Sequence, residues 1–408
     1  MENLKNYLQF KEDQIHQLVE TSGDPSESQL TSFVGAFANQ FLNDIVTIHA
    51  PSNVKNIATS GLTVMGWDHR RNTGNELSTT RFVEGIDHMQ AAIQLLNEVP
   101  EPTVTEMEDL SEAADKLWDL DINRVHPNHD YAINVQGGKK VYDKSDTARD
   151  PFFSFVDAKV LEKPTFRAFI DLLDNYVATT GTAEVVTSSE RKENYDFLHQ
   201  IMETGVMKYC HRLLSKKGLA PSDTKEFVSF LHNLWFGLYR RTTNNDSSGF
   251  EHVFLGEIKN DAVTGMHNWI QLYLEEQKGT LDYRGFIKPR RKPSIQGCYV
   301  DKNAQQVVTI QFEWNNCLKN VSSSMIGTSP EFEIALYTMC FLAGEEKTIV
   351  KCGPYRMELT CYKYTSRGHK YIGTSFPSDM PLDENEAAAK IQSSYRGKST
   401  RNRNNYHR

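Results

Sequence analysis

The chain has 408 residues, of which 39% are hydrophobic and 11% are aromatic, and this composition is typical of a folded globular protein. Its length is sufficient for two or three units of ordinary domain size. The net charge of −8 does not by itself indicate nucleic-acid binding, although the field at one groove matters more than the total.

The sequence carries no signal for a membrane or for the ordinary secretory route. It has no apolar run of about 18 residues, and residues 1–11 lack the apolar core of a signal peptide. The six cysteines form no C-x-x-C pair and no zinc-finger spacing, so we expect free buried thiols in a reducing compartment. We therefore predict a cytoplasmic protein without membrane contact, with a nuclear or secreted location as the alternatives.

Residues 1–104 are predicted to form a helical N-terminal module of unknown role. Its apolar residues recur at helical spacing at both ends of the segment: Leu4, Leu8, Ile15 and Leu18, then Ile86, Met89, Ile93 and Leu96. Pro100 and Pro102 end the second pattern.

The next part of the chain changes from helical to strand-like patterns. Apolar residues at spacings of three and four predict helices over residues 162–176, 195–214 and 227–235. Residues 306–314 and 356–364 alternate or are rich in β-branched and aromatic side chains, as strands are. Helices followed by a mixture of strands and helices indicate an α+β domain.

Residues 381–408 are predicted to form a separate helix and a basic tail. The segment IQSSYRGKSTR at 391–401 resembles the IQ motif, whose pattern residues here are Ile391, Gln392, Arg396, Gly397 and Arg401. A basic helix with apolar anchors suits a groove in an acidic, methionine-rich partner. The resemblance implies calmodulin or a calmodulin-like light chain as the partner; the alternative is a basic tail that touches RNA or nothing.

Two histidines occur in unusual sequence contexts: His252 within GFEHVFLGEIK at 249–259, and His267 within GMHNW at 265–269. Histidine exchanges protons near neutral pH, and the neighbouring glycines permit close approach of a substrate to the backbone. The pair therefore indicates acid–base chemistry, and the alternative is two histidines that are hydrogen-bonded for structural reasons.

The sequence segments around these histidines resemble those of the EndoU family of uridylate-specific endoribonucleases. The resemblance is carried by ordered matches at 110–111, 117–118, 121–124, 130–137, 172–176, 249–259, 265–276, 282–283, 326–333 and 373–377. It implies an endoribonuclease domain over residues 105–380. It also implies a fold of two lobes, each with antiparallel sheet and packed helices.

The same resemblance implies the catalytic roles. His252, His267 and Lys319 match the two histidines and the lysine of the family pattern. We expect His267 to be the base, His252 the acid and Lys319 the phosphorane stabiliser, although the histidine roles could be swapped. The backbone N–H of Gly265 is a candidate for binding a phosphate oxygen.

Base choice is expected from Ser323, Thr374 and Phe376. Family members usually carry tyrosine where this chain has Phe376, so a phenyl ring remains for stacking and the phenolic hydroxyl is gone. Glu251 and Glu257 flank the first histidine and could orient an imidazole or help to hold a cation. The resemblance implies Mn²⁺ or Ca²⁺, but no metal ligands are identified from the sequence.

These observations predict an endoribonuclease that cleaves single-stranded RNA at uridines. The 2′-hydroxyl would attack the phosphorus and leave 2′,3′-cyclic phosphate and 5′-hydroxyl ends. The resemblance to the IQ motif implies that calmodulin links this cleavage to calcium. The alternative is a non-catalytic RNA-binding or calmodulin-binding scaffold on the same fold. The oligomeric state is not readable from the sequence, and a monomer is favoured.

Overall fold

The structure is a computed structural model that describes residues 67–68, 73–74, 99–288, 306–366 and 368–380. The chain divides into two compact units, Met1–Pro100 and Glu101–Arg408. In the first unit, strands β1 (Trp67–Asp68) and β2 (Thr73–Gly74) pair in antiparallel fashion. The predicted helices of residues 1–104 and the IQ segment lie outside the described residues. None of the helices in the described ranges is long and apolar enough to cross a membrane.

The second unit begins with a group of helices whose starts are fixed by side-chain caps. They are α5 (Val104–Glu108), α6 (Leu110–Leu120), α9 (Ser188–Met202), α10 (Gly205–Lys216) and α11 (Thr224–Phe236). The helix predicted over 195–214 is two helices, because the Thr204 hydroxyl accepts the N–H of Met207 and starts α10 anew. The stripe of Phe227, Leu231 and Trp235 is confirmed as the buried face of α11.

The helix predicted over 162–176 is shorter in the structure. Helix α7 (Ala158–Leu161) is followed by α8 (Pro164–Ile170), with Pro164 at the first helical position. Beyond Ile170 the backbone continues in tighter turns, since the N–H groups of Leu172 and Leu173 bond to carbonyls three residues back. The apolar spacing persists through these turns, which explains why the sequence pattern overruns the helix.

The larger sheet has six strands in the order β4-β8-β9-β10-β7-β6. These are β4 (Gly138–Lys139), β6 (Glu257–Lys259), β7 (Ala262–Thr264), β8 (Leu281–Ile287), β9 (Val307–Trp314) and β10 (Cys317–Met325). The expectation of antiparallel sheet is wrong here, because β4 pairs with β8 and β7 with β10 in parallel. Those pairs join strands that are distant in sequence, so no hairpin forces them to be antiparallel.

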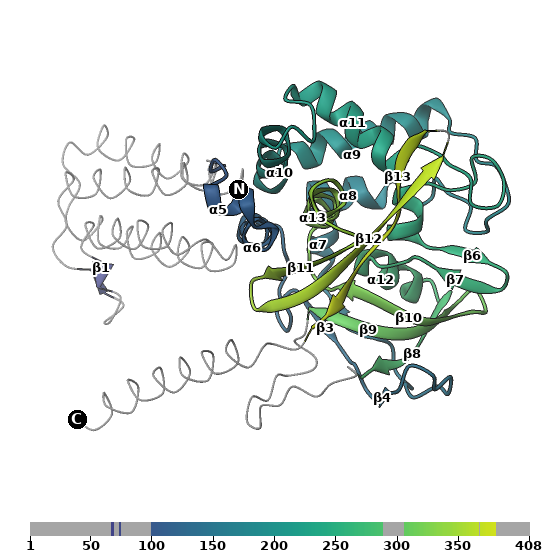
Figure 1. The fold of residues 1–408 in the computed structure, drawn as a ribbon. Coiled ribbons are helices and arrows are strands. Elements are labelled where there is room, and N and C mark those ends of the chain that lie inside the picture. Colours follow the sequence, from purple (N-terminus) through teal and green to yellow (C-terminus); the bar gives the residue numbers. More distant parts are fainter. Residues whose placement is uncertain (1–66, 69–72, 75–98, 289–305, 367, 381–408) are drawn as a thin grey trace, which may run out of the picture. The chain divides into compact units, whose positions relative to one another are not determined.

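A second, three-stranded sheet is antiparallel throughout. Strands β11 (Lys347–Cys352), β12 (Tyr355–Ser366) and β13 (His369–Asp379) are neighbours in that order, which confirms the strand predicted at 356–364. Helix α13 (Pro330–Ala343) is buried along nearly its whole length and contacts α6, α8 and α10 as well as β12 and β13. Figure 1 shows α9, α10 and α11 on one side of this unit and β8, β9 and β10 on the other.

The remaining elements complete the α+β unit. Strands β3 (Tyr131–Ile133) and β5 (Phe153–Val156) pair in antiparallel fashion, and α12 (Trp269–Gln277) starts two residues after His267, with Asn268 as its N-cap. A single turn of π-helix, η1 (Glu251–Leu255), carries His252. The described cysteines are all free thiols; Cys317 is half-buried and the other four are buried.

Candidate active site

His252 lies on a rigid but irregular piece of backbone. The N–H of Gly256 bonds to the carbonyl of Glu251 at 2.9 Å, which closes the wide turn of η1. Phe250 and Phe254 flank the histidine in sequence and are fully buried, and their rings are 5.1 Å apart. Wide turns of this type often occur at functional sites, because they redirect one side chain without breaking the helix. The aromatic core therefore fixes where the imidazole can point.

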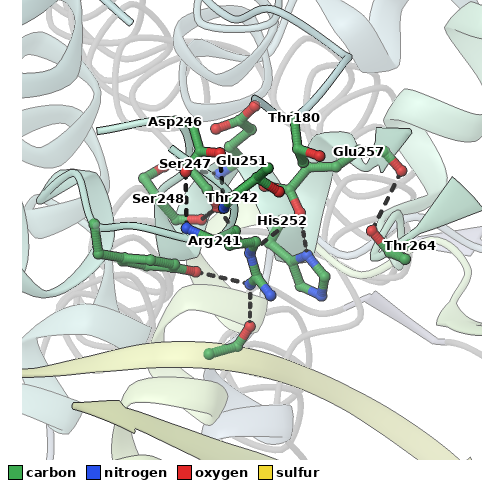
Figure 2. A network of polar contacts seen from close by, with 12 residues as sticks. Thr180, Arg241, Thr242, Asp246, Ser247, Ser248, Glu251, His252, Glu257 and Thr264 are labelled. Carbon is green, nitrogen blue, oxygen red and sulfur yellow. Dashed lines mark hydrogen bonds and ion pairs between the residues drawn. The ribbon is translucent and has the colours of Figure 1, made fainter. Parts of the chain in front are cut away.

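The imidazole of His252 is held by a buried carboxylate. Its Nδ1 lies 2.6 Å from Oε2 of Glu257, a residue of β6 whose side chain is completely buried. Arg241 approaches the same carboxylate oxygen, with its Nε 3.2 Å away (Figure 2). The pKa of His252 is lowered overall: burial lowers it most, the hydrogen bond to Glu257 raises it in part, and the Arg241 charge lowers it further.

His267 has a different partner, which fixes its tautomer. Its Nδ1 lies 2.9 Å from the carbonyl oxygen of Ser323 on β10. A carbonyl only accepts, so Nδ1 carries the hydrogen and the lone pair is on Nε2. Burial, and then the Lys319 charge, hold the pKa of His267 well below its usual value. This histidine is neutral at physiological pH.

The two histidine segments are joined through their backbones. The N–H of Met266 bonds to the carbonyl of His252 at 3.1 Å, and the N–H of His267 bonds to that of Val253 at 2.8 Å. Gly265 precedes this contact with a φ of +68°, and a Cβ at that position would lie 1.8 Å from the His252 carbonyl oxygen. Only glycine combines this backbone angle with so close an approach.

Lys319 completes the group of predicted catalytic residues. It lies on β10, just before a register shift between Lys319 and Ser322. Burial lowers the pKa of its ammonium to about 8. Its charge lowers the pKa of both His252 and His267, so the three groups influence one another in one place. Each of the three is slightly accessible, with exposed fractions of 7% for His252, 6% for His267 and 9% for Lys319.

Two of the three residues predicted for base recognition contact this group directly or through the backbone. The ring of Phe376 stacks on the imidazole of His267, with centroids 5.1 Å apart and planes at 24°. Ser323 supplies the carbonyl that holds His267, and its hydroxyl lies 2.9 Å from that of Thr309 on β9. Thr374 is two residues before Phe376 on β13, so its side chain lies on the same face of that strand.

The two glutamates behave differently. Glu257 contacts His252, as expected of an orienting residue. Glu251 is 1% exposed, and its carboxyl lies within hydrogen-bonding reach of the Glu184 carboxyl. Burial, together with the nearby Glu184 and Glu257, raises its pKa, so the carboxyl is protonated at neutral pH. The hydroxyl of Ser322 also lies 3.3 Å from Nδ1 of His267. The sequence patterns around the histidines did not indicate Arg241, Ser322 or Thr309, because these residues lie apart from the histidine motifs or are of common types.

The described residues do not form an evident divalent-metal site. No group of three or more His, Cys, Asp or Glu side chains within them is arranged to hold a metal ion. The carboxyl of Glu251 is buried beside that of Glu184, but its raised pKa disfavours the ionised form that a hard cation requires. The Mn²⁺ or Ca²⁺ expected from the resemblance is thus not matched by a ligand set among the described residues.

The chain is similar in sequence and in fold to known endoribonucleases. The sequence profile of the family "Endoribonuclease XendoU" matches residues 109–377. The chain is 44% identical over 277 residues to uridylate-specific endoribonuclease B of Danio rerio, covering 66% of this chain and 95% of that protein. It is 42% identical to poly(U)-specific endoribonuclease-A of Xenopus laevis, with 66% and 93% covered. The solved structure of XendoU, described as a splicing-independent snoRNA processing endoribonuclease, matches with a TM-score of 0.58 and 42% identity, over 67% of this chain and 97% of that one.

The backbone junction between the histidines predicts a strong effect of Gly265→Ala. A Cβ there meets the His252 carbonyl, so the two histidine segments must separate; we expect a loss of stability of about 3 kcal/mol or more. A displacement of about 1 Å can lower turnover by about 100-fold. The measurements are thermal unfolding and kcat/KM on a uridine-containing RNA.

Gly279→Ala is the matched control for this variant. Gly279 has a similar φ of +74°, with nothing within 4 Å of its added Cβ. The Gly279→Ala variant should lose only about 1–2 kcal/mol of stability, the cost of placing alanine at a left-handed backbone angle, and it should keep its activity. Equal effects of the two substitutions would show that the contact with His252 is not critical.

Proposed function

The chain belongs to the XendoU endoribonuclease family and is a uridylate-specific endoribonuclease, and we propose that it cleaves RNA by transphosphorylation with two histidines and one lysine. The ribose 2′-hydroxyl attacks the adjacent phosphorus, the bond to the 5′-oxygen breaks, and a 2′,3′-cyclic phosphate and a 5′-hydroxyl result. This reaction needs one proton acceptor, one proton donor and a group that stabilises charge on the phosphorane. The observation that carries the proposal is the different partner of each imidazole.

His267 is assigned as the general base. Its Nδ1–H donates to the Ser323 carbonyl, which leaves Nε2 unprotonated and able to accept the 2′-hydroxyl proton. The low pKa of His267 keeps this nitrogen available at neutral pH. A neutral carbonyl orients the ring but stabilises the protonated imidazolium less than a carboxylate would. This suits a general base, which must be unprotonated before the reaction.

His252 is assigned as the general acid. Its Nδ1 faces the Glu257 carboxylate at 2.6 Å, and a carboxylate favours the protonated imidazolium. The proton on Nε2 is then the one delivered to the departing 5′-oxygen. Because the Glu257 contact raises the pKa of His252 whereas His267 has no carboxylate partner, His252 keeps its proton to higher pH.

Lys319 is assigned to the phosphorane. Its ammonium is buried and close enough to both imidazoles to lower their pKa values, and a positive charge in such surroundings interacts with an anion more strongly than it would in water. The N–H of Gly265, next to the backbone junction, is a second candidate donor to a phosphate oxygen.

Uridine recognition is assigned to the surfaces beside His267. The phenyl ring of Phe376 provides an apolar face, and the hydroxyls of Ser323 and Thr374 can pair with the edge of a pyrimidine. Phe376 has no phenolic hydroxyl and so offers no polar group of its own to the base. We therefore expect a preference for uridine that rests on stacking and on the two hydroxyls.

The reaction is tested with a short RNA that contains one uridine. We expect a 2′,3′-cyclic phosphate on the 5′ fragment and a 5′-hydroxyl on the other, read by end-group labelling and mass spectrometry. His252→Ala and His267→Ala should each lower kcat by about 100- to 10,000-fold while thermal unfolding stays near that of the unaltered protein. A 3′-phosphate formed without a cyclic intermediate would contradict the mechanism.

The acid and the base are distinguished with an RNA whose scissile 5′-oxygen is replaced by sulfur. A thiolate leaves without a proton, so His252→Ala should recover most of its lost rate on this RNA and His267→Ala should not. Recovery in the His267 variant alone would mean that the two roles are reversed.

Lys319 predicts a specific pH dependence. The Lys319 side chain is protonated below its pKa of about 8 and neutral above it. The slope of log kcat/KM against pH should therefore become more negative by about one as pH rises through about 8, because one additional essential proton is lost. Lys319→Arg keeps its charge over this range, so its alkaline limb should lack that additional loss. The slope of log kcat/KM between about pH 7 and 9.5 decides the matter, with thermal unfolding at each pH as control. An unchanged alkaline limb would remove Lys319 from this role.

The C-terminal segment carries a separate proposal, calmodulin binding through Ile391, Gln392, Arg396, Gly397 and Arg401. It rests on the motif alone. The full chain should be retained on immobilised calmodulin, with or without calcium, and the variant Ile391→Asp with Arg396→Glu should not. No retention of the unaltered chain in either state would end this proposal. RNA cleavage should be the same for both forms without calmodulin.

A further inference from the structure

Arg241 lies outside the predicted catalytic group but contacts the Glu257 carboxylate. It lies in the loop after α11, and its guanidinium reaches four groups. The Nε lies 2.9 Å from the Ser247 hydroxyl and 3.2 Å from Oε2 of Glu257. The Nη2 donates to the Tyr239 hydroxyl at 2.8 Å and to the carbonyl of Gly373. Figure 2 shows Arg241 beside the imidazole of His252 within this network.

Two of these contacts belong to different parts of the site. Glu257 is the partner of His252. Gly373 lies on β13, one residue before Thr374 and three before Phe376. A single planar guanidinium therefore joins the histidine that handles the leaving group to the strand proposed to recognise the base. A lysine ammonium is a point charge and cannot span both with fixed geometry.

Local hydrogen bonds hold the backbone of the loop that carries Arg241. The carboxylate of Asp246 accepts the backbone N–H groups of Arg241, Thr242, Thr243 and Gly181 at 2.7 to 3.0 Å. The backbones of Tyr239 and Ser247 also pair with each other. Burial opposes ionisation of Asp246, but these four donors hold its pKa below the usual value. The backbone of Arg241 is thus fixed independently of substrate.

The charges around His252 come from several elements. Glu257 on β6 raises its pKa, whereas Arg241 in the loop and Lys319 on β10 lower it. His267, before α12, is also close enough to interact electrostatically. Of these groups, Arg241 contacts the same carboxylate oxygen, Oε2 of Glu257, as His252 does. Arg241 therefore helps to hold that oxygen in place, and its positive charge weakens the effect of the carboxylate on the pKa of His252.

We propose that Arg241 is a positioning residue, which holds Glu257 against His252 and ties that pair to β13, so that protonation of the leaving group and recognition of the base depend on one geometry. The proposal rests on the assignment of His252 as general acid. It does not place Arg241 against the substrate.

The test compares Arg241→Met with Arg240→Met, a matched control that removes the same charge from the adjacent, exposed arginine. Substrates are a one-uridine RNA with a 5′-oxygen leaving group, the same RNA with a 5′-sulfur leaving group, and a one-cytidine RNA. We expect Arg241→Met to lose about 10- to 100-fold in kcat/KM on the oxygen RNA, as partners of catalytic side chains usually do. It should lose far less on the sulfur RNA, and its uridine-to-cytidine ratio should fall. Arg240→Met should match the unaltered protein throughout.

Equal losses of Arg241→Met on the oxygen and sulfur RNAs, or an unchanged uridine-to-cytidine ratio, would overturn the proposal. His252→Ala is measured on the same RNAs to separate the two hypotheses. If His252→Ala does not recover on the sulfur RNA, the assignment of the general acid is wrong. If His252→Ala recovers and Arg241→Met does not, only the role of Arg241 is wrong. Arg241→Lys, which keeps the charge but not the fork, should resemble Arg241→Met.

Discussion

The geometry of the site depends on the backbone junction between residues 252–253 and 266–267. Two main-chain hydrogen bonds bring the histidine segments together, and Gly265 permits the approach because it has no Cβ. Main-chain contacts inside a buried core have little freedom, so the fold fixes where the two histidine side chains begin, and their partners at Nδ1 then fix how each ring is oriented. The other groups are arranged around this junction: Lys319 on β10, Glu257 on β6 and Phe376 on β13.

Around that junction, the electrostatics separate two side chains of the same type. Burial lowers the pKa of both histidines, but only His252 faces a carboxylate. An acid and a base can thus be made from identical imidazoles by the choice of partner at Nδ1. The guanidinium of Arg241 also contacts the Glu257 carboxylate, and its positive charge limits how strongly that carboxylate stabilises the imidazolium of His252. The site is therefore tuned by groups that are not themselves placed on the reacting atoms.

Much of this could be predicted from the sequence, for physical reasons. The α+β class follows from apolar periodicity, and the strands near 306–314 and 356–364 are present. The histidine frames contain both His252 and its partner Glu257, because the two are joined by a short local turn. Periodicity failed where local capping overrides it: Thr204 divides one predicted helix into two. It also gave no information on the parallel pairs β4–β8 and β7–β10, which depend on contacts between distant segments.

Arg241 and Thr309 show why the rest of the site could not be predicted. Each contacts the histidine environment through tertiary structure, and neither stands in a spacing that indicates a role. The low exposure of the proposed catalytic residues has a further consequence. His252, His267 and Lys319 are each less than a tenth exposed, so an RNA linkage that reaches all three must enter the protein surface. A nucleotide stacked and paired within a double helix cannot turn its sugar and phosphate inward in this way. RNA folding should therefore protect many uridines from this enzyme, and loops and unpaired ends should determine where transcripts are cut.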